Sequence, residues 1–186
     1  MVRERAEADQ HSARIATAAL AGGEGFQLHA RVAMRIAEFL SPEAVVPDLK
    51  AQSKADVLRE LSESLSHAQP SLKPERLVEV LKDREKLGST GIGDGVAIPH
   101  GKLTGINQLV ASFGVSKGGV DFDAIDGRPT HLFFALVAPE NSAGVHLKAL
   151  ARISRLFKNP RFRQAILEAG TAQDIYRLIA EEDARA

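Results

Sequence analysis

His100 is the residue best placed for chemistry, because it lies near the end of a glycine-rich run, GSTGIGDGVAIPHGKL, over residues 88–103. It stands between Pro99 and Gly101. Proline fixes its own φ and biases the preceding residue towards an extended shape, whereas glycine lets a ligand or another backbone approach closely. We therefore expect a loop that presents the imidazole of His100 to a partner, as a nucleophile, a ligand or a proton carrier.

Of the six histidines in the chain, His146 is the second candidate for chemistry. The apolar spacing predicts that it lies in the first turn of a helix. Unpaired backbone N–H groups and the helix dipole favour an anion there and disfavour a protonated imidazole. A lone histidine is more often structural, and the Pro-His-Gly setting is what favours His100. The other four histidines lie in the N-terminal stretch, at a predicted helix end or at the start of a predicted strand: His11, His29, His67 and His131.

The glycines do not form a nucleotide-binding motif. A phosphate-binding loop requires GxxxxGK followed by Ser or Thr, but here Gly101 and Lys102 are followed by Leu103. The glycine spacing does not give GxGxxG either. Nucleotide binding is therefore disfavoured, and we expect no cofactor.

A metal site is disfavoured by the scarcity of ligands. Zinc usually takes three or four protein ligands, and only Asp94 and Glu140 could join the two histidines. The sequence has no HxxxH or HxH spacing around them, and it has no cysteine. We therefore expect no metal.

Phosphoryl transfer suits the residues around His100 better. A neutral imidazole is a good nucleophile near pH 7, since its ordinary pKa is about 6.5. The transferring group spreads negative charge over its oxygens and needs positioned donors and cations. The candidates are the planar guanidinium of Arg84, the ammonium of Lys102, and the hydroxyls of Ser89 and Thr90 with the neighbouring N–H groups. For Arg84, a solvated arginine at a helix end is the alternative explanation.

Composition limits the class of protein. The 186 residues suit one domain with a short extension. A formal net charge of zero argues against a general nucleic-acid binder. No apolar run is long enough to span a bilayer, and the start lacks the cleanly basic character of a signal peptide. We therefore expect a cytoplasmic protein without membrane insertion. Residues 1–33 have no sustained apolar period and are expected to be a disordered or non-family extension.

The remaining pattern predicts an α/β domain over residues 34–186, with a mixed sheet of four or five strands flanked by helices. Helices are expected at 35–40, from the Ser53 cap to about 69, from Pro74 to about 87, at 142–158, 160–167 and 172–182. Strands are expected at 45–46, 109–115, 120–122 and 132–137, with a turn at 118–119. The run 132–137 is continuously apolar and is predicted to be a central strand buried on both faces.

The stretch REKLGSTGIGDGVAIPHGKL, residues 84–103, resembles the signature of enzyme IIA of the fructose/mannitol class of bacterial phosphotransferase systems. The resemblance continues through residues 122–150, covers about residues 34–182, and is greatest to the nitrogen-regulatory branch. It implies that His100 is phosphorylated through Nε2 by a phosphohistidine of a small HPr-like carrier protein. It also implies that His146 hydrogen-bonds the phosphoryl group, that Arg84 helps to hold it, and that no metal or nucleotide is needed. Ser89 and Thr90 lie in the matching loop.

The resemblance leaves three functions to compare. Nitrogen-regulatory members mainly bind other proteins, including potassium transport and sensor systems, according to their phosphorylation state. Sugar-specific members pass the phosphoryl group to a IIB domain, and a third alternative is a binding module that has lost phosphotransfer. No IIB, IIC or HPr-like domain is attached to this chain, which favours the regulatory function. All the polar residues expected for transfer are present, which disfavours the binding module.

Overall fold

The computed structural model describes residues 34–186, so the expected extension, with His11 and His29, lies outside the described residues. A short 3-10 helix, Ile36–Glu38, opens the described part. The strands are β1 (Leu40–Val46), β2 (Gly91–Gly93), β3 (Val96–Ala97), β4 (His100–Leu103), β5 (Val110–Val120) and β6 (Thr130–Pro139). The helices are α2 (Lys54–Ala68), α3 (Pro74–Glu85), α4 (Ala143–Leu156), α5 (Pro160–Glu168) and α6 (Ala172–Arg185). No helix within residues 34–186 is long and apolar enough to cross a membrane.

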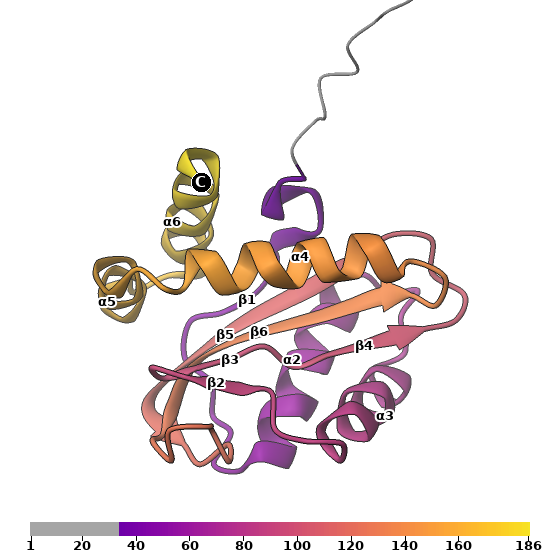
Figure 1. Ribbon diagram of the computed structural model, residues 1–186, viewed down its shortest axis with the longest axis horizontal. Coiled ribbons are helices and arrows are strands. Elements are labelled where there is room, and N and C mark those ends of the chain that lie inside the picture. Colours follow the sequence, from indigo (N-terminus) through magenta and orange to yellow (C-terminus); the bar gives the residue numbers. More distant parts are fainter. Residues whose placement is uncertain (1–33) are drawn as a thin grey trace, which may run out of the picture. The chain divides into compact units, whose positions relative to one another are not determined.

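The described strands form one mixed sheet in the order β1-β5-β6-β3-β2, with β4 also paired to β6 (Figure 1). Strand β6 runs antiparallel to β5 and parallel to both β3 and β4. The prediction of a mixed α/β fold is confirmed. Six strands form within residues 34–186, rather than the expected four or five.

Strand β6 is the centre of the sheet and contributes to both cores. Phe133, Ala135 and Val137 belong to the core beneath α2 and α3, whereas Leu132 and Phe134 belong to the core beneath α4, α5 and α6. Helix α4 crosses one face of the sheet while α2 and α3 cover the other (Figure 1). The predicted central strand, buried on both faces, is therefore confirmed.

The predicted starts of α2, α5 and α6 agree with the structure. The Ser53 side chain accepts a hydrogen bond from the Asp56 backbone at the start of α2, and Thr171 does the same for Asp174 in α6. Asn159 caps α5. Such caps satisfy backbone donors that a helix leaves unpaired in its first turn, which is why short polar residues mark these boundaries in the sequence.

Three local predictions are wrong. The glycine run is not one irregular loop, because it contains β2, β3 and the start of β4. Strand β5 continues through the expected turn at 118–119 to Val120, with a register irregularity after Val115 and a positive φ of 75° at Gly119. The first helix is a single 3-10 turn, and Leu40 already belongs to β1. Glycine tolerates the positive φ that a bulge requires, so the strand bends there instead of ending.

Strands β3 and β4 both pair with β6. Ile98 and Pro99 lie between them and belong to neither strand. Val96 is in register with Leu132 on β6, and His100 is in register with Leu136. Pro99 has no N–H to donate, but its carbonyl accepts from the Leu136 backbone at 2.9 Å. His100 is thereby fixed as the first residue of a paired strand.

Gly101, the next residue, lets α3 pack directly against β4. A Cβ at this position would lie 2.4 Å from Val80 Cγ1 and 3.2 Å from the Val80 carbonyl oxygen. We expect Gly101→Ala to destabilise the fold by roughly 1–3 kcal/mol, the usual cost of overpacking, as measured by urea unfolding. Gly118→Ala is the matched control, because a Cβ there meets nothing within 4 Å.

Val80→Ala should relieve part of this cost. The double variant Gly101→Ala/Val80→Ala should therefore be less destabilised than the sum of the two single variants. Strict additivity would show that the contact with Val80 is not the cause.

Candidate functional site

The imidazole of His100 is held in one tautomer by the backbone. Its Nδ1 lies 2.7 Å from the carbonyl oxygen of Ile98. A carbonyl can only accept, so Nδ1 carries the proton, and Nε2 keeps its lone pair. The ring is half-buried at the start of β4. Nε2 is therefore the nitrogen that can act as a nucleophile or an acceptor.

Arg84 places its guanidinium beside that nitrogen. It lies in the last turn of α3, where its Nε donates to His100 Nε2 at 3.3 Å and its Nη1 donates to the Gly88 carbonyl at 3.0 Å. Burial lowers the pKa of His100, and the charge of Arg84 lowers it further, while the bond to Ile98 and the charge of Glu85 oppose the shift without reversing it. His100 is therefore neutral and nucleophilic at pH 7.

His146 comes from α4, which lies on the face of the sheet opposite to α3 (Figure 1). It lies in the first turn of α4, is only 7% exposed, and its ring centroid is 5.5 Å from that of His100 in an edge-on arrangement. Burial lowers its pKa, and the neighbouring His100 and Lys102 lower it further. Its Nε2 is buried and makes no hydrogen bond within residues 34–186. Buried polar atoms without partners are uncommon in folded proteins, so this nitrogen still has a hydrogen bond to make.

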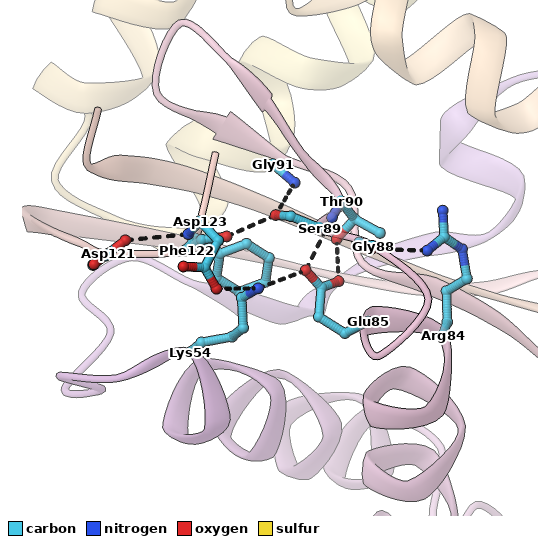
Figure 2. Close-up of polar contacts among 10 residues, drawn as sticks. All are labelled: Lys54, Arg84, Glu85, Gly88, Ser89, Thr90, Gly91, Asp121, Phe122 and Asp123. Carbon is cyan, nitrogen blue, oxygen red and sulfur yellow. Dashed lines mark hydrogen bonds and ion pairs between the residues drawn. The ribbon is translucent and has the colours of Figure 1, made fainter. Parts of the chain in front are cut away.

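The remaining predicted residues lie around this cluster in different ways. Lys102 is exposed on β4, two positions beyond His100. The Ser89 hydroxyl donates to the Phe122 carbonyl at 2.7 Å and accepts from the Gly91 backbone at 3.1 Å (Figure 2). The Thr90 hydroxyl is buried and donates to Glu85 at 2.6 Å. Both hydroxyls are therefore bonded to protein groups, and their role as donors to a phosphoryl group stays a prediction.

The candidate metal ligands do not join the histidines. The Asp94 carboxylate lies 4.0 Å from the guanidinium of Arg163. In the part of the chain that the structure describes, no three His, Asp or Glu side chains gather as metal ligands would. The arrangement of His100, His146 and Arg84 suits an anionic group better, because it offers a nucleophile and nitrogen donors.

Glu85 and Lys54 lie beside the site but are not among the residues that the sequence predicts for it. Glu85 is the last residue of α3 and is buried, and its carboxylate is 3.0 Å from the Lys54 ammonium at the first residue of α2 (Figure 2). A carboxylate at a helix C-terminus and an ammonium at an N-terminus both oppose the helix dipole. Both charges lie at helix ends that the sequence predicts, so their unfavourable positions could have identified the pair from the sequence.

These features define an α/β protein in which a strand presents one imidazole nitrogen and two helices from opposite faces bring it a guanidinium and a second imidazole. Residues 38–182 match the family model described as phosphoenolpyruvate-dependent sugar phosphotransferase system, EIIA 2. The chain therefore belongs to this family, whose role is phosphotransfer between proteins.

The chain is similar to both regulatory and sugar-specific proteins. It is 42% identical over 154 residues to a nitrogen regulatory protein of Bradyrhizobium diazoefficiens, covering 82% of this chain and 99% of that protein. It is 35% identical over 150 residues to the fructose-specific EIIABC component of Bacillus subtilis, covering 81% of this chain and 24% of that protein. The crystal structure of the nitrogen regulatory protein IIA-Ntr from Neisseria meningitidis has a TM-score of 0.72 and 36% identity, and covers 77% of this chain and 98% of that one. The identities support the nitrogen-regulatory branch.

The lowered pKa values of both histidines predict a loss of stability in mild acid. The unfolded chain binds more protons than the folded chain once the pH falls below about 6.5, the ordinary pKa of histidine. The stabilising contribution is thus complete above that pH and is lost as the pH falls towards the lower pKa values of the folded state. We expect urea unfolding of the wild type to show this loss between pH 7.5 and 5.5.

The double variant His100→Gln/His146→Gln should lose part of that pH dependence, whereas His67→Gln, which alters an exposed histidine, should keep it. Because the remaining histidines also titrate in this range, the comparison is between the pH slopes of the variants. Equal slopes in the wild type and the double variant would contradict the expectation.

Proposed function

We propose that this protein accepts a phosphoryl group on His100 Nε2 from a phosphohistidine of a small HPr-like carrier, and regulates partner proteins according to its phosphorylation state. The observation that carries the proposal is the bond from His100 Nδ1 to the Ile98 carbonyl, with Arg84 beside Nε2. We further propose that the protein acts in the cytoplasm.

The transfer step needs no base. The N–P bond of the carrier breaks as the Nε2–P bond forms, and the leaving imidazole recovers the electron pair of the broken bond. Nε2 of His100 carries no proton to lose, and Nδ1 keeps the proton that it shares with Ile98. Arg84 donates to Nε2 before transfer, and its guanidinium can donate to the phosphoryl oxygens as that lone pair becomes a bond.

The surface near these residues suits a protein donor. Leu87 is 84% exposed three positions after Arg84, and Val145 and Leu147 are 46% and 67% exposed on either side of His146. Exposed apolar side chains favour a protein contact over a small charged molecule. We propose that the carrier protein docks here. We also propose that the regulated targets, such as potassium transport or sensor proteins, bind this protein.

A sugar-transport role is the second candidate, because the chain also resembles a fructose-specific protein at 35% identity. The two roles differ in where the phosphoryl group goes. Incubation of the phosphorylated protein with a fructose-class IIB domain tests this directly: rapid and complete transfer to IIB would favour transport, and its absence would favour regulation.

The His100→Ala variant tests the acceptor. Incubation with phosphoenolpyruvate, enzyme I and an HPr-like carrier should label the wild type with acid-labile phosphate and leave this variant unlabelled. His131→Ala is the matched control, because it removes a histidine of β6 whose Nδ1 is bonded to the Ser116 carbonyl outside the site. Wild-type labelling of His100→Ala would refute the assignment, provided that circular dichroism shows that both variants fold.

The His146→Ala variant tests the second histidine. Removal of one donor to a developing charge commonly slows a reaction by about 100-fold or more, so we expect a loss of this size in the rate of phosphoryl uptake. His146→Gln keeps an N–H donor and should lose less. If His146→Ala were instead unfolded by circular dichroism while His146→Gln transferred at the wild-type rate, the role of His146 would be structural.

A further inference from the structure

Glu85 lies in a costly position that the fold alone does not explain. It is the last residue of α3, directly after Arg84, and its side chain is only 5% exposed. Burial of a carboxylate costs free energy unless it is paired and hydrogen-bonded. The negative end of the helix dipole adds to that cost. The position therefore requires compensation from elsewhere.

Lys54 supplies the compensating charge from a second helix. As the first residue of α2, it stands at the positive end of a dipole, where a cation is equally misplaced. Its Nζ is 3.0 Å from Glu85 and 2.9 Å from Asp123, and it lies 4.8 Å above the Phe122 ring. The pair cancels both unfavourable charges, but well-packed apolar residues commonly stabilise such a place as well or better. The charge pairing alone therefore does not account for the position, and the hydrogen bonds of the carboxylate must be considered as well.

The carboxylate of Glu85 closes the turn that follows Arg84. Its Oε1 accepts from the Thr90 backbone at 2.9 Å and its Oε2 accepts from the Thr90 hydroxyl at 2.6 Å (Figure 2). Within this closed turn, the Gly88 carbonyl accepts from Arg84 Nη1 at 3.0 Å. The turn thus fixes the guanidinium at one end, while its Nε is directed at His100.

The same carboxylate is also linked to His100, through Thr90 and Ile98. The Thr90 carbonyl accepts from the Ile98 backbone at 3.0 Å. The Ile98 carbonyl in turn lies 2.7 Å from His100 Nδ1 and fixes its tautomer. The ring is therefore two hydrogen bonds away from Thr90, which the carboxylate holds, and the guanidinium is bonded to Gly88 in the turn that the carboxylate closes.

We propose that Glu85, paired with Lys54, is a positioning residue for the phosphoryl-accepting site, which fixes the guanidinium of Arg84 and the ring of His100 without touching the phosphoryl group. The inference rests on the proposed function. Because Glu85 is buried, it is not part of the surface that a carrier protein contacts.

The first test needs no phosphotransfer. In the unphosphorylated wild type, the ¹⁵N signals of the His100 ring should report a single Nδ1–H tautomer. In Glu85→Gln, which keeps the shape of the side chain but removes its charge, we expect a mixture of tautomers. Glu79→Gln is the matched control, because Glu79 lies on the same helix in an exposed ion pair with Arg76. Its His100 signals should match the wild type.

The second test measures phosphoryl uptake at varied carrier concentration. Misplacement of reacting groups by about 1 Å can cost roughly 100-fold, so Glu85→Gln should lower kcat by roughly 10- to 100-fold with little change in KM. A raised KM with unchanged kcat would show that Glu85 acts on docking and would overturn the proposal. An unlabelled wild type would refute the proposed function, while the ring signals would still decide the role of Glu85.

A second variant separates positioning from stability. Lys54→Met/Glu85→Leu replaces the ion pair by apolar side chains of similar size, an exchange that often preserves the fold. We expect this variant to fold, to show mixed His100 tautomers and to transfer slowly. A stably folded variant with one tautomer and the wild-type rate would overturn the proposal.

Discussion

The chemistry of the candidate site depends on one hydrogen bond, from His100 Nδ1 to the carbonyl of Ile98. It can form because the strand is interrupted. Strand β3 ends at Ala97 and β4 begins at His100, so the Ile98 carbonyl lies in the break between them. Pro99 has no N–H to donate here, but its carbonyl accepts a hydrogen bond from the Leu136 backbone of β6. The interruption therefore gives the ring a backbone acceptor and still leaves it on a rigid strand, which is the support that a precise site requires.

The site also joins the two layers of the domain. Arg84 comes from α3, which packs on the core that includes Phe133 and Val137. His146 comes from α4, which packs on the opposite core with Phe134. Side chains alternate along β6 between the two cores, so the distance between the guanidinium and the second imidazole depends on the thickness of the sheet and its packing. A substitution deep in either core is expected to move one partner relative to the other, although it lies far from His100.

Much of this fold follows from the sequence. Caps such as Ser53 and Thr171 act through local hydrogen bonds, and the run at 132–137 is apolar throughout because both faces of the strand are buried. Strands β2 and β3 could not be predicted in the same way, since they have only three and two residues and show no periodicity. The resemblance marked His100 and Arg84, and the structure places them within hydrogen-bonding distance. The bonds of Ser89 and Thr90 to Phe122 and Glu85 depend on tertiary packing, so no local pattern shows them.

Under the proposed function, the electrostatics of the site favour a phosphorylation that can be reversed. Both imidazoles are kept neutral mainly by burial, so the nucleophile is available without a proton-transfer step. A phosphoryl group adds roughly −1.5 to −2 charges, and Arg84 and Lys102 lie near where it would arrive. Arg84, however, already donates to His100 and Gly88 in the unphosphorylated state. Phosphorylation exchanges the bond to His100 for bonds to the phosphoryl oxygens, so the net gain is smaller than the bonds themselves. A site that gains only this difference does not trap the phosphoryl group, so its phosphorylation state can change in both directions.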